Sequence, residues 1–137
     1  MYRRVELFVL DIFISIQKIK HTVKKFKTQK ELFYSYESWN SVIRELEVIG
    51  EATKYLIKEG ALPEDYRVIV NFRNVIIHNY FGIDAEEIWD VVKNDLLEFE
   101  KIIRNLIYKM VTEDAINDFI EDNKYLDFIV EELEKLK

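Results

Sequence analysis

Apolar residues recur along the chain at the three- and four-residue spacing of amphipathic helices. One stripe crosses residues 2–26, and its members are Val5, Phe8, Val9, Ile12, Phe13, Ile16 and Ile19. A second stripe predicts a helix over residues 31–59, which Gly60 is suited to end because glycine tolerates the left-handed conformation at the end of many helices. Pro63 predicts the start of a third helix that reaches about Tyr80.

Two further helices are predicted in the second half of the chain. Asp84 occupies an N-cap position and Glu87 the capping-box position, a pattern that nearly fixes the start of a fourth helix. This helix should run to about Met110. Thr112 is suited to cap a fifth helix that continues to near Leu136.

The composition favours the same architecture. The 137 residues are 49% hydrophobic but include only three glycines and one proline, a balance typical of packed helices with few turns. The sequence therefore predicts an all-α antiparallel bundle of four to five helices, forming a single domain over residues 1–137. Within it, residues 111–137 are expected to be a C-terminal helical extension, which either packs on the bundle or reaches out to a partner. We expect it to pack.

Charge and cysteine content limit the function. The formal net charge is -6, which argues against a surface that binds nucleic acid everywhere, so any RNA contact must be local. The chain has no cysteine, hence neither a disulfide framework nor a thiolate zinc site, and we expect a cytoplasmic protein without a membrane span. Acidic residues crowd the segment from Glu113 to Glu134, whereas positive charge gathers early, at Lys18, Lys20, Lys24, Lys25, Lys27 and Lys30.

The predicted third helix carries a group of four polar side chains. Arg73 and Tyr80 project from nearly the same side, and Asn74 and His78 lie on the adjoining stripe. We expect this group to face outward, because the opposite side of the helix carries the apolar residues that should enter the core, namely Ile69, Phe72, Val75 and Ile76.

Val70 and Ile77 are apolar residues on the predicted outward side, which a simply solvated face rarely carries. A second copy of the chain is the simplest cover, so we expect a homodimer in which two polar groups meet across a cleft. Histidine exchanges protons near neutral pH and arginine holds phosphates, so His78 and Arg73 suit cleavage of RNA through its 2′-hydroxyl, without metal or cofactor. The other interpretation of the group is an interface whose polar atoms are satisfied by hydrogen bonds.

Three blocks of the sequence resemble the HepT-like group of HEPN proteins, which are toxin components of toxin–antitoxin pairs. Residues 73–80 match the signature R-x-x-x-x-H-x-Y, and residues 44–52 resemble the block R-x-L-E-x-I-G-E-A. Residues 81–96 resemble the segment on the C-terminal side of the histidine in that group. The resemblance implies a helical HEPN bundle that dimerises, with a ribonuclease site at the dimer cleft.

The resemblance also implies residue roles and a partner. Arg73 and His78 correspond to the catalytic pair, Asn74 to the polar residue after the arginine, and Tyr80 to the tyrosine that a cognate minimal nucleotidyltransferase antitoxin modifies with AMP. It thus predicts a metal-independent endoribonuclease toxin of a type VII-like toxin–antitoxin system, inhibited by AMPylation of Tyr80. The alternative is a non-catalytic HEPN module that partners a nucleotidyltransferase and binds a nucleotide in the same cleft.

Overall fold

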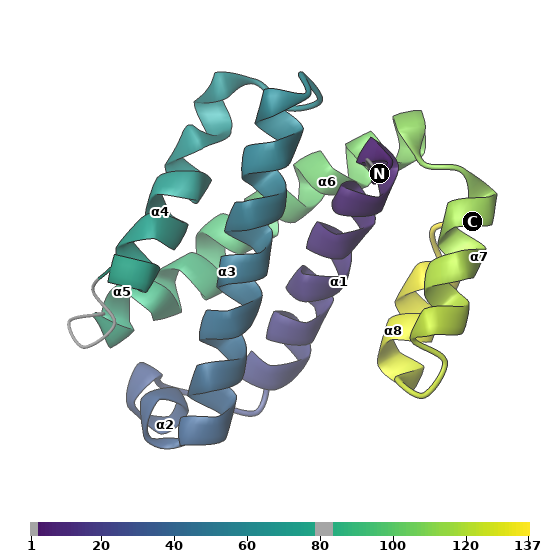
Figure 1. Cartoon of the computed structure of the whole chain (residues 1–137). Helices are drawn as coiled ribbons and strands as arrows, with labels where there is room; N and C mark the ends of the chain where they lie inside the picture. Colours follow the sequence, from purple (N-terminus) through teal and green to yellow (C-terminus); the bar gives the residue numbers. More distant parts are fainter. Residues whose placement is uncertain (1–2, 79–83) are drawn as a thin grey trace.

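The computed structural model describes residues 3–78, except for the side chain of His78, and residues 84–137. In these residues the predicted all-α bundle is confirmed (Figure 1). No helix in the described part of the chain is both long and apolar enough to cross a membrane. The elements are α1 (Val5–Val23), α2 (Gln29–Tyr34), α3 (Tyr36–Lys58), the 3₁₀ turn η1 (Glu64–Tyr66), α4 (Arg67–His78), α5 (Ala85–Asp90), the π-helical turn η3 (Val91–Asp95), α6 (Leu96–Met110), α7 (Glu113–Asp122) and α8 (Asp127–Glu134).

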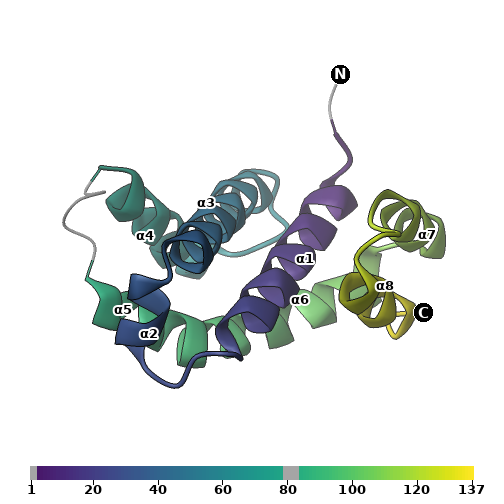
Figure 2. The same cartoon turned by 90° about the horizontal axis from the view of Figure 1, so that it is seen from below.

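The helix predicted over residues 31–59 is wrong in one respect, because the segment forms two helices that meet at Ser35. The backbone of Ser35 leaves the helical region, with φ -89° and ψ 86°, and its N–H donates to the carbonyl oxygen of Leu32 at 3.1 Å. Leu32 is fully buried and anchors the short helix α2. The break turns α2 across the lower end of the bundle, where it packs beside α5 (Figure 2).

The predicted fifth helix begins as expected but also divides in two. The Thr112 hydroxyl oxygen accepts a hydrogen bond from the N–H of Ala115 at 3.1 Å and so caps α7. Helix α7 ends before Asn123, whose backbone has φ -115° and ψ 20° and whose side chain donates to the carbonyl oxygen of Phe119 at 2.8 Å. The backbone N–H of Asn123 donates to the same carbonyl oxygen at 3.1 Å, so this residue closes the end of α7, and α8 begins four residues later.

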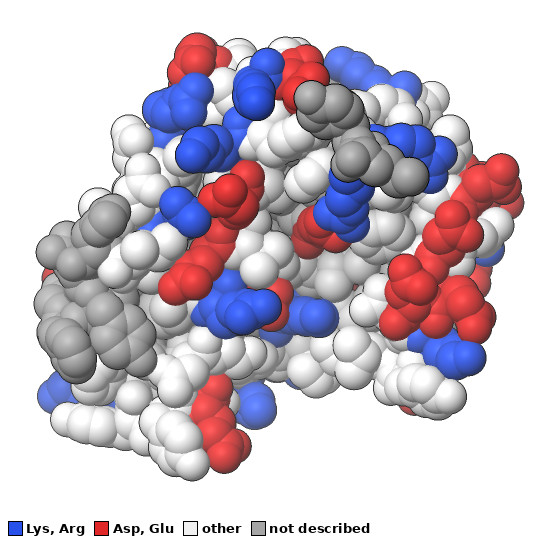
Figure 3. Space-filling view, in the orientation of Figure 1, with Lys and Arg blue, Asp and Glu red and all other residues white. Residues whose placement is uncertain are grey.

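The two C-terminal helices pack on α1, so the expectation that this segment packs on the bundle is confirmed. The buried carboxylate of Glu6 on α1 accepts a hydrogen bond from the N–H of Thr112 at 2.8 Å. On α8, Phe128 stacks on His21 of α1, with ring centroids 3.8 Å apart. Helix α7 presents a row of acidic side chains to solvent (Figure 3).

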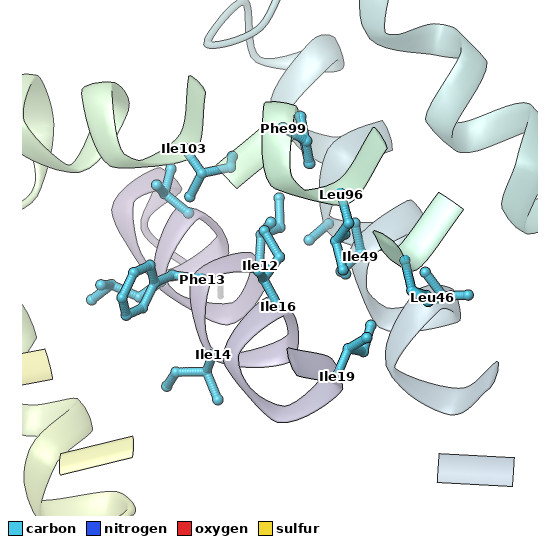
Figure 4. Packing of buried hydrophobic residues seen from close by; sticks show 14 of the residues in the cluster. Ile12, Phe13, Ile14, Ile16, Ile19, Leu46, Ile49, Leu96, Phe99 and Ile103 are labelled. Atoms are coloured by element: carbon cyan, nitrogen blue, oxygen red, sulfur yellow. The ribbon is translucent and has the colours of Figure 1, made fainter. Parts of the chain in front are cut away.

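Helix α1 is buried on nearly every side. Residues 12–17 are consecutive and all buried, although the sequence pattern predicts only one apolar stripe. Figure 4 shows Ile12 and Ile16 pointing toward α3 and α6, whereas Ile14 points away from them, toward the side of α7 and α8. The guanidinium of Arg104 on α6 lies over the ring of Phe13, 5.1 Å from its centroid. A helix with apolar residues all round must be covered all round. In this fold α3, α6 and the α7–α8 pair supply the cover.

One buried carboxylate joins α6 to α1. Glu100 accepts hydrogen bonds from Gln17 Nε2 at 3.0 Å, from Lys20 Nζ at 2.9 Å and from Arg104 Nη2 at 2.8 Å. Burial alone would raise the pKa of Glu100, but these donors outweigh it and hold the pKa below its ordinary value of 4.5. Arg104 also reaches Glu132 on α8 at 3.7 Å, so this cluster connects three helices.

Replacing Glu100 with glutamine should reveal the contribution of this charge. A carboxylate whose folded pKa lies below its unfolded pKa stabilises the fold above the unfolded value, and this stabilisation is lost as pH falls through the folded value. We expect Glu100→Gln to lower the free energy of unfolding by about 2 kcal/mol near neutral pH and by less at a pH below the lowered pKa of Glu100. Urea denaturation at the two pH values measures the difference.

Glu98 provides the matched control on the same helix. Its pair with Lys101, at 3.3 Å, joins two side chains that are both about three-quarters exposed. Glu98→Gln should therefore change stability by no more than about 0.5 kcal/mol. Equal losses in the two variants, or a loss in Glu100→Gln that does not depend on pH, would contradict the role of the buried cluster.

Candidate active site

Helix α4 carries the predicted polar group and runs antiparallel to α3, against which it packs (Figure 1). The burial along α4 corrects its predicted orientation. Val70, expected to face outward, is only 3% exposed, and Val75, expected in the core, is 46% exposed. The helix is therefore rotated so that Val70 and Arg73 both lie on its packed side, and the prediction that the whole polar group faces outward is wrong for Arg73.

Gly50 of α3 explains this rotation. A Cβ atom on Gly50 would collide with Cβ of Arg73 and would lie only 2.6 Å from its Cγ. These are the side-chain atoms nearest the α4 backbone, so they cannot move away unless the helix moves. The missing side chain at Gly50 therefore lets α4 approach α3 closely, and the packing decides which side of α4 is buried.

The guanidinium group of Arg73 is held at the edge of this contact. Its Nη2 forms an ion pair with Oε2 of Glu51 at 2.9 Å, and its Nη1 donates a hydrogen bond to Oδ1 of Asn74 at 3.1 Å. Nε is buried without a hydrogen-bond partner among the described residues. The Arg73 side chain is 26% exposed and that of Glu51 is 60% exposed. Because an ion pair open to water contributes little, an anion can replace Glu51 at modest cost.

The remaining members of the predicted group lie toward the end of α4. His78 is the last residue of α4 and lies five positions after Arg73, or about 7.5 Å along the axis. The structure thus brings Arg73 and Asn74 together and fixes the backbone of His78, whose side chain lies outside the described part of the chain. Tyr80 also lies outside the described residues. Convergence of all four groups stays a prediction.

Sequence reasoning assigned no role to two residues that shape this site, Gly50 and Glu51. Both lie in the block over residues 44–52 that carries part of the family resemblance. One signal was available, because a glycine inside a long helical pattern often marks a close packing contact. Elsewhere in the described chain, no group of three or more histidine or carboxylate side chains is placed to hold a metal ion.

Comparison with known protein families shows which family the chain belongs to. The profile of the family described as Ribonuclease HepT-like matches residues 12–106, well over half of the chain. The chain belongs to this family. The match runs from α1 into α6, so it includes Gly50, Glu51 and the whole of α4, whereas α7 and α8 of this HepT-like protein lie beyond it.

Relatives of this HepT-like protein occur in Methanocaldococcus jannaschii. One, named "Gamma-glutamylcyclotransferase and putative RNase", is 32% identical over 98% of this chain, but the chain spans only 59% of that relative's length. Two others are each named "Putative RNase". One is 34% identical over 72% of this chain, and the alignment covers 93% of that relative's length. The other is 35% identical over 74% of this chain, and the alignment covers 89% of its length. No solved structure matches the chain.

Gly50→Ala tests the close contact between α3 and α4. Alanine normally stabilises a helix interior by about 1 kcal/mol relative to glycine. Here the collision with Arg73 should reverse the sign and destabilise the protein by about 1 to 3 kcal/mol in thermal or urea denaturation. Lys54→Ala, an exposed change one turn along α3, should alter stability by less than about 0.5 kcal/mol. Stabilisation by Gly50→Ala would rule out the contact.

Proposed function

We propose that this protein is a metal-independent endoribonuclease, with its active site on α4. The observation that carries the proposal is the placement of Arg73 between Glu51 and Asn74, one and a half turns before His78, in a chain of the HepT-like ribonuclease family. The relatives bearing RNase in their names support the same class of substrate.

In the proposed reaction, His78 removes the proton of a ribose 2′-hydroxyl, and the oxygen attacks the adjacent phosphorus. The bond to the 5′-oxygen breaks, that oxygen receives a proton, and the products carry a 2′,3′-cyclic phosphate and a 5′-hydroxyl. Arg73 stabilises the negative charge on the pentacoordinate phosphorus, and Asn74 orients a phosphate oxygen. Glu51 acts through Arg73 as a positioning residue. DNA is not a substrate because it lacks the 2′-hydroxyl.

The proposed active form is a homodimer in which α4 meets its copy. One side of α4 carries two exposed apolar side chains two turns apart, Val68 at 66% and Val75 at 46% exposed. Ile77, 41% exposed, lies on another side near the end of the helix. Apolar groups gathered on one helix face are typical of a surface that another protein covers. A twofold arrangement would bring two Arg73 and His78 pairs to one cleft and double its positive charge.

The finer proposal is a toxin in a type VII-like toxin–antitoxin pair with a minimal nucleotidyltransferase antitoxin. It rests on the match of residues 73–80 to the R-x-x-x-x-H-x-Y signature. AMP attached to Tyr80 would add bulk and negative charge two residues after His78. That charge would compete with the substrate phosphate for Arg73 and so inhibit cleavage.

Loss of either proposed catalytic residue should abolish RNA cleavage without unfolding the protein. We expect His78→Ala and Arg73→Ala each to lower the rate by at least about a hundredfold, measured on total cellular RNA in EDTA with analysis of the product ends. His21→Ala is the matched control, since His21 stacks on Phe128 and has no role in the proposed reaction. It should cleave at the wild-type rate.

Full activity of His78→Ala would refute the proposed mechanism. Intact RNA after incubation with wild-type protein, whose mass excludes bound AMP, would instead favour the non-catalytic module that binds a nucleotide in the cleft.

The regulatory proposal predicts one modified residue. Coexpression with a cognate nucleotidyltransferase should add the mass of AMP to the protein and relieve growth arrest, whereas Tyr80→Phe should remain unmodified and toxic because it lacks the acceptor oxygen. Tyr108→Phe is the control, because Tyr108 is 90% exposed and freely accessible. If Tyr108→Phe escaped modification and Tyr80→Phe did not, the assignment of Tyr80 would be wrong.

A further inference from the structure

The connection between α1 and α3 carries the strongest local positive charge of the chain. Between residues 18 and 37 there are six lysines and two glutamates, although the whole chain has a formal net charge of -6. Four of the lysines, at positions 24, 25, 27 and 30, are exposed or partly exposed, and none of them takes part in the ion pairs among the described residues. Their charges are therefore available to an anionic ligand.

Three aromatic rings lie exposed directly after these lysines. Phe33 is 44% exposed, Tyr34 is 77% exposed and Tyr36 is 70% exposed. The break at Ser35 accounts for this, since residues 34 and 36 would point in opposite directions in a continuous helix. We call the four lysines and three rings the basic aromatic surface; its members are Lys24, Lys25, Lys27, Lys30, Phe33, Tyr34 and Tyr36.

The backbone beneath this surface is well supported. Thr28 caps α2 by accepting a hydrogen bond from the N–H of Glu31 at 3.3 Å, and Leu32 is fully buried. Phe33 makes edge-to-face contacts with Tyr34 on one side and Trp39 on the other, with ring centroids 5.7 and 5.1 Å away. The rings of Phe33 and Tyr34 are therefore held in contact with each other and with the fold, so they need little ordering when a ligand binds. The hydroxyl group of Tyr36 donates a hydrogen bond to Oε1 of Glu37 at 3.4 Å.

The basic aromatic surface lies at the end of the bundle toward which α4 points. Tyr36 begins α3, and Gly50, which contacts Arg73, lies about 21 Å further along that helix. Helix α4 runs back in the opposite direction, so its last residue, His78, lies only about 14 Å from the level of Tyr36 along the bundle. Helix α2 also packs on α5, the first helix after α4. A single-stranded segment of a few nucleotides can span this distance.

We propose that the basic aromatic surface is a binding site for single-stranded RNA, with bases stacked on Tyr34 and Tyr36 and phosphates held by the lysines. The proposal rests on the ribonuclease function above and assigns to it a site that holds the substrate on one side of the scissile bond.

The combination of residues favours RNA over a protein partner. Aromatic rings stack on any base, and lysines bind any phosphate, so the pair is typical of sites that grip a single strand with little sequence preference. Burial lowers the pKa of His21, and repulsion by Lys24 and Lys25 lowers it further, which indicates a positive field at the edge of the surface. Figure 2 shows α2 on one flank of α1 and the acidic helices α7 and α8 on the other.

Binding can be measured separately from cleavage with 2′-O-methyl RNA, which keeps the bases and phosphates but cannot supply the attacking hydroxyl. Fluorescence anisotropy of a labelled single strand of roughly 12 nucleotides gives Kd. We expect Tyr34→Ala and Tyr36→Ala each to raise Kd roughly tenfold, and the phenylalanine variants at both positions to bind like wild type because the stacking ring remains. Tyr108→Ala and Tyr125→Ala, at rings about 90% exposed elsewhere, should bind normally.

The lysines should determine the salt dependence. The double variant Lys24→Gln/Lys25→Gln should reduce the slope of log Kd against log salt concentration by about 1.4, or about 0.7 for each lost phosphate contact. Lys54→Gln/Lys58→Gln makes the same charge change at the opposite end of α3 and should leave the slope unchanged. On cleavable RNA, the variants of the basic aromatic surface should raise KM and leave kcat near the wild-type value.

The outcomes separate this proposal from the ribonuclease itself. Cleavage of RNA by wild type, with unchanged Kd in the tyrosine and lysine variants, would overturn the RNA site and keep the enzyme. Tyrosine-dependent binding without cleavage would support the site and overturn the enzyme. A change of elution volume in Tyr34→Ala/Tyr36→Ala, with RNA binding intact, would identify the surface as a protein interface and overturn the proposal.

Discussion

Helix α1 packs against α3 on one side, against α6 on a second and against the α7–α8 pair on a third. Its sequence forces this arrangement, because residues 12–17 place apolar side chains in almost every direction and each must leave water. The two buried polar residues of this stretch, Ser15 and Gln17, are paired with Glu45 on α3 and Glu100 on α6. Hydrogen bonds thus fix the rotation of α1 relative to both neighbours, and α3 in turn becomes the support for α4.

The candidate active site depends on the packing of α4 against α3, and this packing requires the absence of a side chain at Gly50. Two rigid helices meet where Gly50 has no side chain, and the stem of Arg73 fills the space. The guanidinium then forms an ion pair with Glu51 and donates a hydrogen bond to Asn74. An arginine held in this way loses little conformational entropy when a phosphate arrives, whereas a free surface arginine must first be ordered. An incoming phosphate must, however, compete with the Glu51 carboxylate for the guanidinium.

Periodicity and caps predicted the helices because both depend on residues close together in sequence. Thr112 caps α7 as expected, through a contact three residues away. The break at Ser35 escaped prediction because no glycine or proline marks it and the apolar stripe continues across it. The rotation of α4 about its own axis was not predicted, for another reason. Val70 lies on the same side of the helix as the polar group and Val75 on the apolar side, so the pattern predicts that Val70 is exposed and Val75 is buried. The close contact at Gly50 reverses this, and it joins residues far apart in sequence.

Helices α7 and α8 lie beyond the part of the chain that the family profile matches, yet Ile129 and Leu133 are completely buried. They cover the face of α1 on which Ile14 lies (Figure 4). Removal of α7 and α8 would therefore expose apolar side chains on this face of α1 to water. The face of α1 that they cover would then be an apolar surface open to association with other proteins.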